Sequence, residues 1–328
     1  MGEDMTVAAA ADPARIHVPV MRERILELLS PALAAPGSIH VDGTLGMGGH
    51  AEAVLEACPG ARVVGIDRDP DALAIARARL ERFGDRFTAV EAVYDELPEV
   101  LGSLGIAEIN AMLLDLGLSS LQIDRRERGF AYSVDAPLDM RMDGKQGQTA
   151  ADVINRYEPR ELVRILRVYG EERFADRIVR RIVEAREVEP FERSGRLVRV
   201  IGEAIPMAAR RSGGHPAKRT FQALRIEVND ELGVLERALP AAIEALAVGG
   251  RIAVITFHSL EDRIVKQTLA EGATDHTPHG MPVPLPEHGP VLRLLTRGGE
   301  AASEVEITAN SRAASARVRA AERIRRAA

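Results

Sequence analysis

A short apolar segment that runs into a glycine-rich turn is the feature that most constrains the fold of this chain. The stretch from Val41 to His50 reads VDGTLGMGGH, and the helix-compatible stretch AEAVLEA follows it. Glycine lets the backbone take positive φ and lets a ligand lie against the main chain. In an open α/β sheet such a turn lies at the carboxyl ends of the strands, where nucleotides bind. The loop therefore predicts a nucleotide-type ligand on a doubly wound α/β domain.

Apolar and helical segments alternate along most of the chain. RVVGID (62–67), FTAVEA (87–92) and AMLLD (111–115) read as strands, and helical stretches separate them. Asp69 and Pro70 have the form of a helix N-cap followed by proline in the first turn. This alternation is typical of a parallel sheet covered by helices on both faces.

The alternation is interrupted once. Residues 134–217 read as one helix after another, and then a long helix (221–247) and the strand RIAVITFHS (251–259) resume the α/β pattern. We expect VLRLLT and ASARVRAAER to close the sheet as an antiparallel pair. The sequence thus predicts an α/β domain, residues 1–133 with 218–328, and a helical insertion, residues 134–217.

Composition limits the class of protein. The chain has 328 residues, of which 46% are hydrophobic, and no stretch approaches the roughly 18 apolar residues of a membrane span. Its single cysteine, Cys58, excludes an internal disulfide framework and a multi-cysteine zinc site. We expect a cytoplasmic protein that does not engage a membrane. The net charge of −6 argues against a general nucleic-acid coating protein, although residues 310–328 hold six Arg against one Glu.

The strand that follows the glycine loop ends in an acid. Asp67 lies 18 residues after Gly49, where a carboxylate accepts hydrogen bonds from the ribose hydroxyls of a nucleotide. The stretch GMGGHA also satisfies the dinucleotide pattern G-x-G-x-x-A, so NAD and S-adenosylmethionine both fit. Asp42 favours the methyl donor, because a carboxylate before the turn would attract a cationic amino-acid group and repel a pyrophosphate. An NAD-dependent dehydrogenase stays the alternative, with His258 as its acid/base, and no residue cluster predicts a metal.

A second polar cluster follows the fourth strand. Asp115-Leu-Gly-Leu-Ser119-Ser120 is followed by Gln122 and Asp124. In a doubly wound sheet this strand end faces the reactive part of the ligand. A strand end with a simple Asx or Ser turn would give the same pattern.

At this point the sequence resembles the MraW family of ribosomal RNA small-subunit methyltransferases. The resemblance runs from about residue 17 to 323 through the segments HVPVMRERILELL, VDGTLGMGGHA, GIDRDPDAL, LLDLGLSSLQID, RGFAYSVDAPLDMRMD, YGEERFADRIVRRIV, HPAKRTFQALRIEVNDEL, GGRIAVITFHSLEDRIVK and SRAASARVRAAER. Departures are confined to local turns, as at Leu121 and in ANSRA (309–313). The resemblance implies a Rossmann-like methyltransferase that uses S-adenosylmethionine to methylate the N4 of a cytosine in the decoding region of 16S rRNA. It places the cofactor contacts on Gly48, Gly49, His50, Asp67, Tyr94, Asp115 and Gln122.

The implied reaction needs a group that holds the cytosine amino nitrogen. We expect Asp115, with Ser119 or Ser120, to do this, and Phe130 or Tyr132 to supply a stacking face. Proximity and a polar proton acceptor would provide most of the rate enhancement. DNA amino-methyltransferases have an aromatic residue beside the acid, and this chain has none there.

Four cations near the end of the insertion predict contacts to phosphates. They are Arg210, Arg211, Lys218 and Arg219, within ten residues that contain no acid. Because the chain as a whole is acidic, we expect the assembled small subunit to be a better substrate than naked rRNA. The oligomeric state is open, a homodimer included. A non-catalytic ribosome-assembly factor and a methyltransferase with another acceptor are the remaining alternatives.

Overall fold

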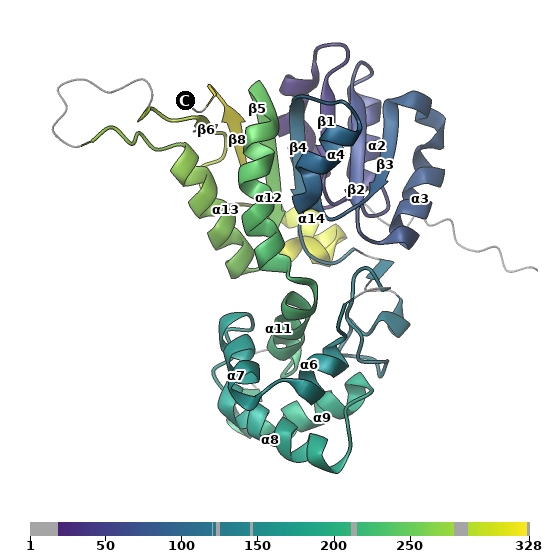
Figure 1. Ribbon diagram of the computed structural model, residues 1–328, viewed down its shortest axis with the longest axis vertical. Helices are drawn as coiled ribbons and strands as arrows, with labels where there is room; N and C mark the ends of the chain where they lie inside the picture. Colours follow the sequence, from purple (N-terminus) through teal and green to yellow (C-terminus); the bar gives the residue numbers. More distant parts are fainter. Residues whose placement is uncertain are drawn as a thin grey trace, which may run out of the picture.

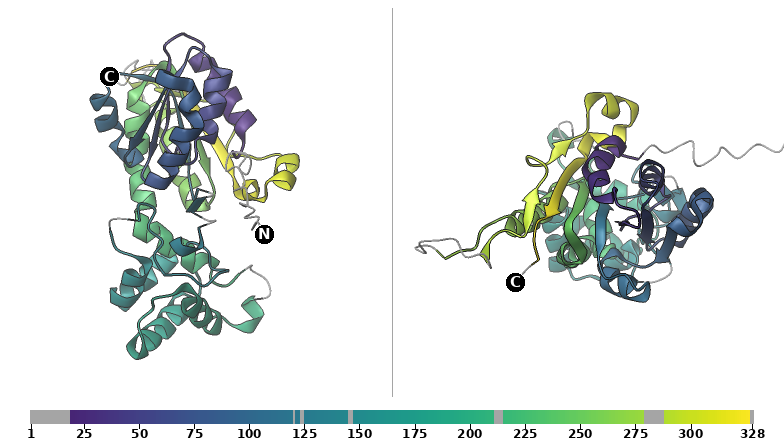
Figure 2. Two further views of the ribbon diagram at one scale, coloured as in Figure 1. Left: turned by 90° about the vertical axis from the view of Figure 1, so that its right-hand side faces the viewer. Right: turned by 90° about the horizontal axis from the view of Figure 1, so that it is seen from above.

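The computed structural model describes residues 19–119, 121–122, 125–144, 147–210, 215–278 and 288–326, without the side chains of Arg126, Ala208 and Arg210. These residues form two lobes, an α/β lobe above and a helical lobe below, which α11 and α12 connect (Figure 1). The view from the side shows the same two-lobed outline (Figure 2).

A single sheet organises the α/β lobe. Its strands are β1 (Ile39–Asp42), β2 (Arg62–Asp67), β3 (Phe87–Glu91), β4 (Ile109–Asp115), β5 (Leu246–Thr256), β6 (Leu292–Leu294), β7 (Glu300–Ala301) and β8 (Arg317–Arg323). Their order is β3-β2-β1-β4-β5-β8-β6, with β7 also on β8. The first five strands are parallel and the last three pair antiparallel. The predicted doubly wound sheet with an antiparallel closing pair is confirmed.

Helices cover both faces of this sheet, as the apolar strands require. In β4, Ala111 and Leu113 point into one core, and Met112 and Leu114 point into the other. The helices of the first face are α1 (Arg22–Leu29), α2 (Gly49–Ala57), α3 (Pro70–Leu80) and the outlying α14 (Glu304–Ala309); those of the second are α4 (Leu97–Ser103), α12 (Glu231–Ala245) and α13 (Ser259–Gly272). Short 3-10 turns lie at η2 (Ser30–Leu33), η3 (Glu81–Arg86), η4 (Tyr94–Glu96), η5 (Arg126–Arg128) and η7 (Ser311–Ser315). Among the described residues, no helix has both the length and the apolar composition needed to cross a membrane.

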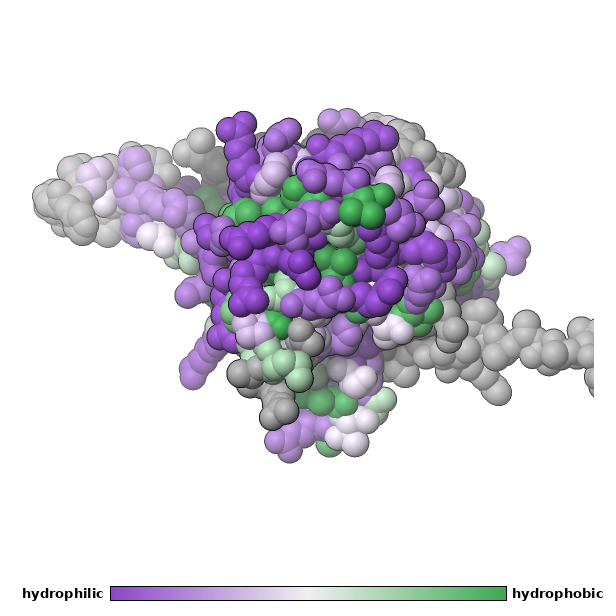
Figure 3. All heavy atoms as spheres, turned by 90° about the horizontal axis from the view of Figure 1, so that it is seen from below, coloured by the Kyte–Doolittle hydropathy of each residue, from purple (hydrophilic) through white to green (hydrophobic). Residues whose placement is uncertain are grey.

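The helical lobe has a core of its own. Its helices are α6 (Ala150–Arg156), α7 (Pro159–Val168), α8 (Ala175–Val188), α9 (Ser194–Ala204), α10 (Met207–Arg210) and α11 (Lys218–Asn229). The core contains Phe130 on the entry side and Phe221 and Leu224 on the exit side. We therefore propose that the inserted unit extends beyond residues 134–217 at both ends, to about 130 and 229. Its outer face presents hydrophilic side chains around a narrow apolar strip (Figure 3).

One expected helix is two helices. We predicted a continuous helix over 221–247, but α11 ends at Asn229 and α12 begins at Glu231. Asp230 between them has φ 50° and ψ 37°, the left-handed region. Aspartate and asparagine adopt that region more readily than other side-chain-bearing residues, so a pattern of helix-compatible residues concealed this break.

Candidate active site

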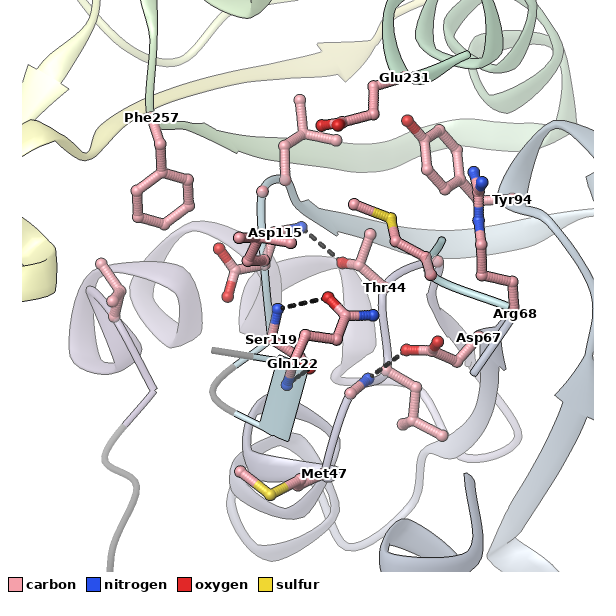
Figure 4. Close-up of a pocket in the computed structure, with 18 of the residues that line it drawn as sticks. Thr44, Met47, Asp67, Arg68, Tyr94, Asp115, Ser119, Gln122, Glu231 and Phe257 are labelled. Carbon is pink, nitrogen blue, oxygen red and sulfur yellow. Dashed lines mark hydrogen bonds between the residues drawn. The ribbon is translucent and has the colours of Figure 1, made fainter. Parts of the chain in front are cut away.

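A cavity of about 550 Å³ opens at the carboxyl ends of the parallel strands. The residues around it come from loops after β1, β2, β3, β4 and β5 and from helices α11 and α12. They include Gly46, Met47, Gly49, His50, Asp67, Arg68, Tyr94, Asp115, Gly117, Ser119, Gln122, Tyr132, Met142, Lys218, Arg225, Glu231, Phe257, Glu261 and Arg312. Figure 4 shows the central ones. A cavity of this size and position suits a nucleotide-sized ligand.

The glycine loop is fixed to the next strand by Asp67. Its Oδ2 accepts a hydrogen bond of 2.7 Å from the Gly46 N–H, and its Oδ1 accepts one of 2.9 Å from the Asp69 N–H. Burial raises the pKa of Asp67 above its usual value. A carboxylate has about four acceptor positions, so Asp67 retains capacity for the two hydroxyls of a ribose.

The Asp115 carboxylate stands on the other side of the loop. The Asp115 N–H donates to the Thr44 hydroxyl over 2.6 Å, which ties the end of β4 to the loop (Figure 4). The Asp115 Oδ2 lies 3.6 Å from Nε2 of His50. Its Oδ1 is buried and has no hydrogen-bond partner. The Asp115 side chain as a whole is 25% exposed and lines the cavity, so its carboxylate can receive a hydrogen bond from a ligand there.

A compact turn holds Gln122 at the cavity. The Ser119 N–H donates to the Gln122 Oε1 at 3.1 Å, and Gln122 donates in turn to Asp69 at 3.4 Å. Asp69 also caps α3 through the Asp71 N–H, as we predicted, and pairs with Arg128 at 3.2 Å. The strand-end turn therefore presents its polar groups in fixed positions.

Tyr94 closes the cavity on the side of β3. Burial raises the pKa of its hydroxyl, so the side chain stays neutral. In Figure 4 its ring lies on the same side of the view as Arg68 and Asp67, with Asp115 on the other side. A neutral aromatic ring with a polar tip suits a planar heterocycle such as adenine.

Three ionisable side chains gather at the far wall. Glu231, His258 and Glu261 each offer a ligand atom, all within 4.8 Å of one another, a spacing that suits a metal ion. Arg225 donates to Glu231 at 2.8 Å, however, and His258 Nε2 lies 3.0 Å from Glu261. Burial raises the pKa of Glu261, but the hydrogen bond from His258 and the Arg225 charge more than offset this and hold that pKa below its usual value. Both carboxylates thus have protein partners, and we assign no metal here.

Comparison with known sequences places the chain in a family. The profile of the MraW methylase family matches residues 14–324. The chain belongs to the MraW methylase family. A methylase of this family takes its methyl group from S-adenosylmethionine. The family assignment decides against the dehydrogenase.

Curated relatives agree over nearly the whole length. The chain is 63% identical to a ribosomal RNA small subunit methyltransferase H of Thermobifida fusca over 313 residues, 95% of each protein. A protein of that name from Streptomyces avermitilis is 60% identical over 94% of this chain and 97% of the relative. Among solved structures, an rRNA methylase from Clostridium thermocellum is 13% identical, covers 92% of this chain and 95% of its own, and has a TM-score of 0.43. That likeness is too distant to decide fold or function.

Most of the expected cofactor residues surround the cavity. Six of the seven line it, namely Gly49, His50, Asp67, Tyr94, Asp115 and Gln122. Gly48 does not: it has φ 80° before α2, and a Cβ there would lie 3.0 Å from Leu80 of α3. Asp42 is 1% exposed and lies behind the loop rather than at the cavity surface. The loop, the ribose acceptor and the cavity size fit S-adenosylmethionine.

The structure describes part of the expected set of substrate-binding residues. Ser119 and Lys218 line the cavity. Arg219 instead donates to the Glu171 carbonyl at 2.9 Å. Ser120 and Arg211 lie outside the described residues, and only the backbone of Arg210 is described. Of the four cations, the side chains of Lys218 and Arg219 are the two that the structure describes.

Several residues at the site were not predicted from the sequence. They are Arg68, Arg128, Met142, Arg225, Glu231, Phe257 and Glu261. Four of them come from α11, α12, the residue that follows β5, and α13, more than 100 residues after Asp115. The segments GGRIAVITFHSLEDRIVK and HPAKRTFQALRIEVNDEL carried the family resemblance. Their position after the insertion was the signal that could have marked them as part of the site.

Proposed function

We propose that this methyltransferase transfers a methyl group to the exocyclic N4 of a cytosine in the decoding region of 16S rRNA. The observation that carries the proposal is the Asp115 carboxylate, which lines the cavity at the end of β4 and has a side chain that is 25% exposed. The names of the 60–63% identical relatives support small-subunit ribosomal RNA as the substrate. Nothing in this reaction requires a metal.

Cofactor binding would use the first half of the site. Bound S-adenosylmethionine supplies an electrophilic methyl group on its sulfonium. Asp67 holds the ribose, Tyr94 borders the adenine, and the backbone from Gly46 to His50 receives the methionine portion. Gln122 holds the turn that follows Asp115. The part of the site that binds the methyl acceptor then faces the part that binds the methyl donor.

The amino group of cytosine is a poor nucleophile, because its lone pair is delocalised into the ring. The Asp115 carboxylate accepts one N–H and so orients the nitrogen towards the methyl group. As the N–C bond forms and the S–C bond breaks, the same carboxylate receives the proton that the nitrogen loses, and S-adenosylhomocysteine leaves. Ser119 can hold the second N–H, while Thr44 fixes the Asp115 backbone. Positioning and one hydrogen-bond acceptor provide the catalysis.

RNA would enter from the junction of the lobes. Lys218 begins α11 and lines the cavity. Arg312, in the turn η7, lines it as well. Cations around a deep cavity suit the phosphates that flank a base splayed out of single-stranded RNA.

An assembled particle is the proposed substrate. The net charge of −6 disfavours binding of free RNA by charge alone, and a structured particle would present the nucleotide in a fixed shape. We further propose that the protein acts in the cytoplasm and that it can do so as a homodimer. Faster methylation of protein-free 16S rRNA than of small subunits would contradict the particle requirement.

Asp115→Ala tests the proposed chemistry. We expect methyl transfer to small subunits to fall at least about a hundredfold, the scale of general acid–base catalysis. Asp115→Asn keeps the shape of the side chain and one acceptor atom but cannot take a proton. Methyl transfer by this variant should therefore fall as well. Isothermal titration with S-adenosylhomocysteine must show retained cofactor binding. Unchanged turnover in Asp115→Ala with cofactor bound would remove Asp115 from the mechanism.

A further inference from the structure

The loop after Asp115 lacks an aromatic residue in the sequence. Leu116, Gly117 and Leu118 follow the acid directly. A base that has left its stack usually lies against an aromatic ring, which restores part of the lost stacking. Within the described part of the chain, three Phe or Tyr side chains line the cavity: Tyr94, Tyr132 and Phe257.

Phe257 lies against the Asp115 loop. Asp115 pairs in register with Ile255 of β5, and the Leu116 N–H donates to the Ile255 carbonyl at 3.0 Å. Gly117 follows Asp115 by two residues, and Phe257 follows Ile255 by two residues. Phe257 therefore lies beside Gly117. Figure 4 shows the Phe257 ring next to the Asp115 carboxylate, on the side away from Asp67.

Gly117 makes room for this ring. A Cβ on Gly117 would lie 3.2 Å from Cδ2 of Phe257, and the φ of 99° at Gly117 also favours glycine. The loop backbone and the ring can thus lie side by side. The ring thus forms an apolar wall beside the Asp115 carboxylate (Figure 4).

The Phe257 backbone is held in place. Its N–H donates to the buried Glu261 at 2.8 Å, and the ring packs against the first core of the α/β lobe. The side chain remains half-buried at the cavity surface. A ring anchored in this way is already positioned for a ligand. The side chain therefore loses little conformational entropy when a ligand binds against it.

The two aromatic residues expected from the sequence are engaged elsewhere. Phe130 is 8% exposed and belongs to the core of the helical lobe. The ring of Tyr132 stacks on His215 at 4.5 Å and meets Phe221 edge-on at 5.9 Å. No other ring among the described residues stacks on Phe257. Tyr94 lies on the far side of the cavity, near Arg68 (Figure 4).

We propose that the face of Phe257 receives the target base while Asp115 holds its amino group. The inference rests on the proposed function and adds the residue that positions the acceptor. Stacking restrains the ring of the base, and the hydrogen bond to Asp115 then fixes its rotation in that plane. Phe257 thereby supplies, from the end of β5, the aromatic residue that the motif at β4 lacks.

The test compares Phe257→Leu with Phe257→Tyr in methyl transfer to small subunits from a strain that lacks this gene. Leucine keeps an apolar wall without a π face, and tyrosine keeps the ring. We expect leucine to lower kcat/KM at least about tenfold and tyrosine to stay within about threefold of wild type, the range set by base–aromatic stacking. The Kd for S-adenosylhomocysteine should be unchanged in both variants.

Phe83→Leu is the matched control. Phe83 is a half-buried phenylalanine that packs against the same core and does not line the cavity. If it lowers kcat/KM as much as Phe257→Leu, the effect is general destabilisation and the proposal fails. Should Phe257→Leu not fold, Phe257→Met fills the same space with a flexible chain and gives the same comparison.

Two outcomes separate this inference from the proposed function. If wild type methylates small subunits and Phe257→Leu is fully active, the role of Phe257 is overturned and the proposed function is not. Absence of wild-type transfer overturns the proposed function and, with it, the inference. Loss of activity in the leucine variant, restored by tyrosine with cofactor affinity intact, supports both.

Discussion

Two ionisable side chains lie buried on the same face of β1. His40 is 0% exposed and Asp42 is 1% exposed, and residues two apart on a strand share a face. Burial lowers the pKa of His40 to about 3 and raises that of Asp42 to about 7. Both shifts favour the neutral form, as expected for groups removed from water. Both side chains are therefore neutral between about pH 3 and pH 7.

Asp42→Asn tests this at the level of stability. A carboxyl whose pKa is raised from 3.8 to about 7 on folding gives stability that is full below pH 4 and lost as the pH rises through 7. Asparagine cannot titrate. The free energy of unfolding of the variant, relative to that of wild type, should therefore increase by more than about 1 kcal/mol between pH 4 and pH 7. Urea unfolding at pH 5 and pH 8 measures the two differences.

His40 makes stability change with pH in the opposite direction, because its pKa in the folded protein lies below its pKa in the unfolded chain. Its contribution to stability rises with pH between about 3 and 6.5. The pH profile of wild type alone thus mixes both groups, whereas the difference between wild type and Asp42→Asn isolates Asp42. An equal difference at both pH values would show that Asp42 is ionised throughout.

Single residues were predictable from the sequence where they end a strand. Asp42, Asp67 and Asp115 could be singled out because each ends an apolar segment. The expectation that Asp42 contacts the ligand came from its position in the motif, and burial of its carboxyl argues against it. Phe257 is 142 residues after Asp115, so no local pattern could link the two.

Among the elements, the end of α11 organises a loop of the site. The Asn229 side chain accepts from the Met142 N–H at 2.8 Å and donates to the Met140 carbonyl at 2.8 Å. Met140 has φ 63°, a conformation that costs energy in a residue with a side chain. Met142 lines the cavity. One buried amide therefore holds a strained loop against the ligand site.

Asn229→Leu keeps the volume and removes these hydrogen bonds. Two backbone groups then lose their buried partner, so we expect the free energy of unfolding to fall by about 2 kcal/mol or more. Cofactor affinity should weaken as well, because Met142 is released. Gln222→Leu on the same helix removes a single, half-exposed hydrogen bond to the Tyr169 carbonyl. It should lower the free energy of unfolding by less than Asn229→Leu does. Equal losses in the two variants would contradict the role assigned to Asn229.

The order of strands and helices was predictable because apolar runs and N-cap signals are local. RVVGID became β2 at the predicted residues, and Asp69 caps α3. The break at Asp230 was not predictable. It rests on the left-handed conformation of the single residue Asp230, which helical periodicity does not report. Phe130 and Phe221 lie outside residues 134–217 but pack in the core of the helical lobe, and no local sequence pattern marks that tertiary contact.

For the whole molecule, the relation between the lobes governs access to the site. Glu171 lies on the turn between α7 and α8 of the helical lobe. Its carboxylate accepts from the Ser259 hydroxyl at 3.0 Å and lies 3.7 Å from Arg263, both on α13 of the α/β lobe. Its carbonyl accepts from Arg219. This exposed contact fixes the approach of the lobes near the cavity.

Glu171→Ala should separate stability from substrate binding. Exposed ion pairs contribute little, so the free energy of unfolding should change by less than about 1 kcal/mol. KM for small subunits should rise severalfold with the cofactor Kd unchanged, because the RNA must contact both lobes. Asp176→Ala removes the exposed pair with Arg167 inside the helical lobe and serves as the control. An unchanged KM in Glu171→Ala would show that this contact does not position the lobes.

The proposed reaction as a whole is best tested by transfer of tritiated methyl from S-adenosylmethionine to small subunits of a strain lacking this gene, with nucleoside mass spectrometry of the 16S rRNA. We predict one labelled nucleoside, a cytidine with the methyl group on its exocyclic nitrogen, and its loss with Asp115→Ala. Label on another atom or base, or no label despite cofactor binding, would contradict the proposed reaction.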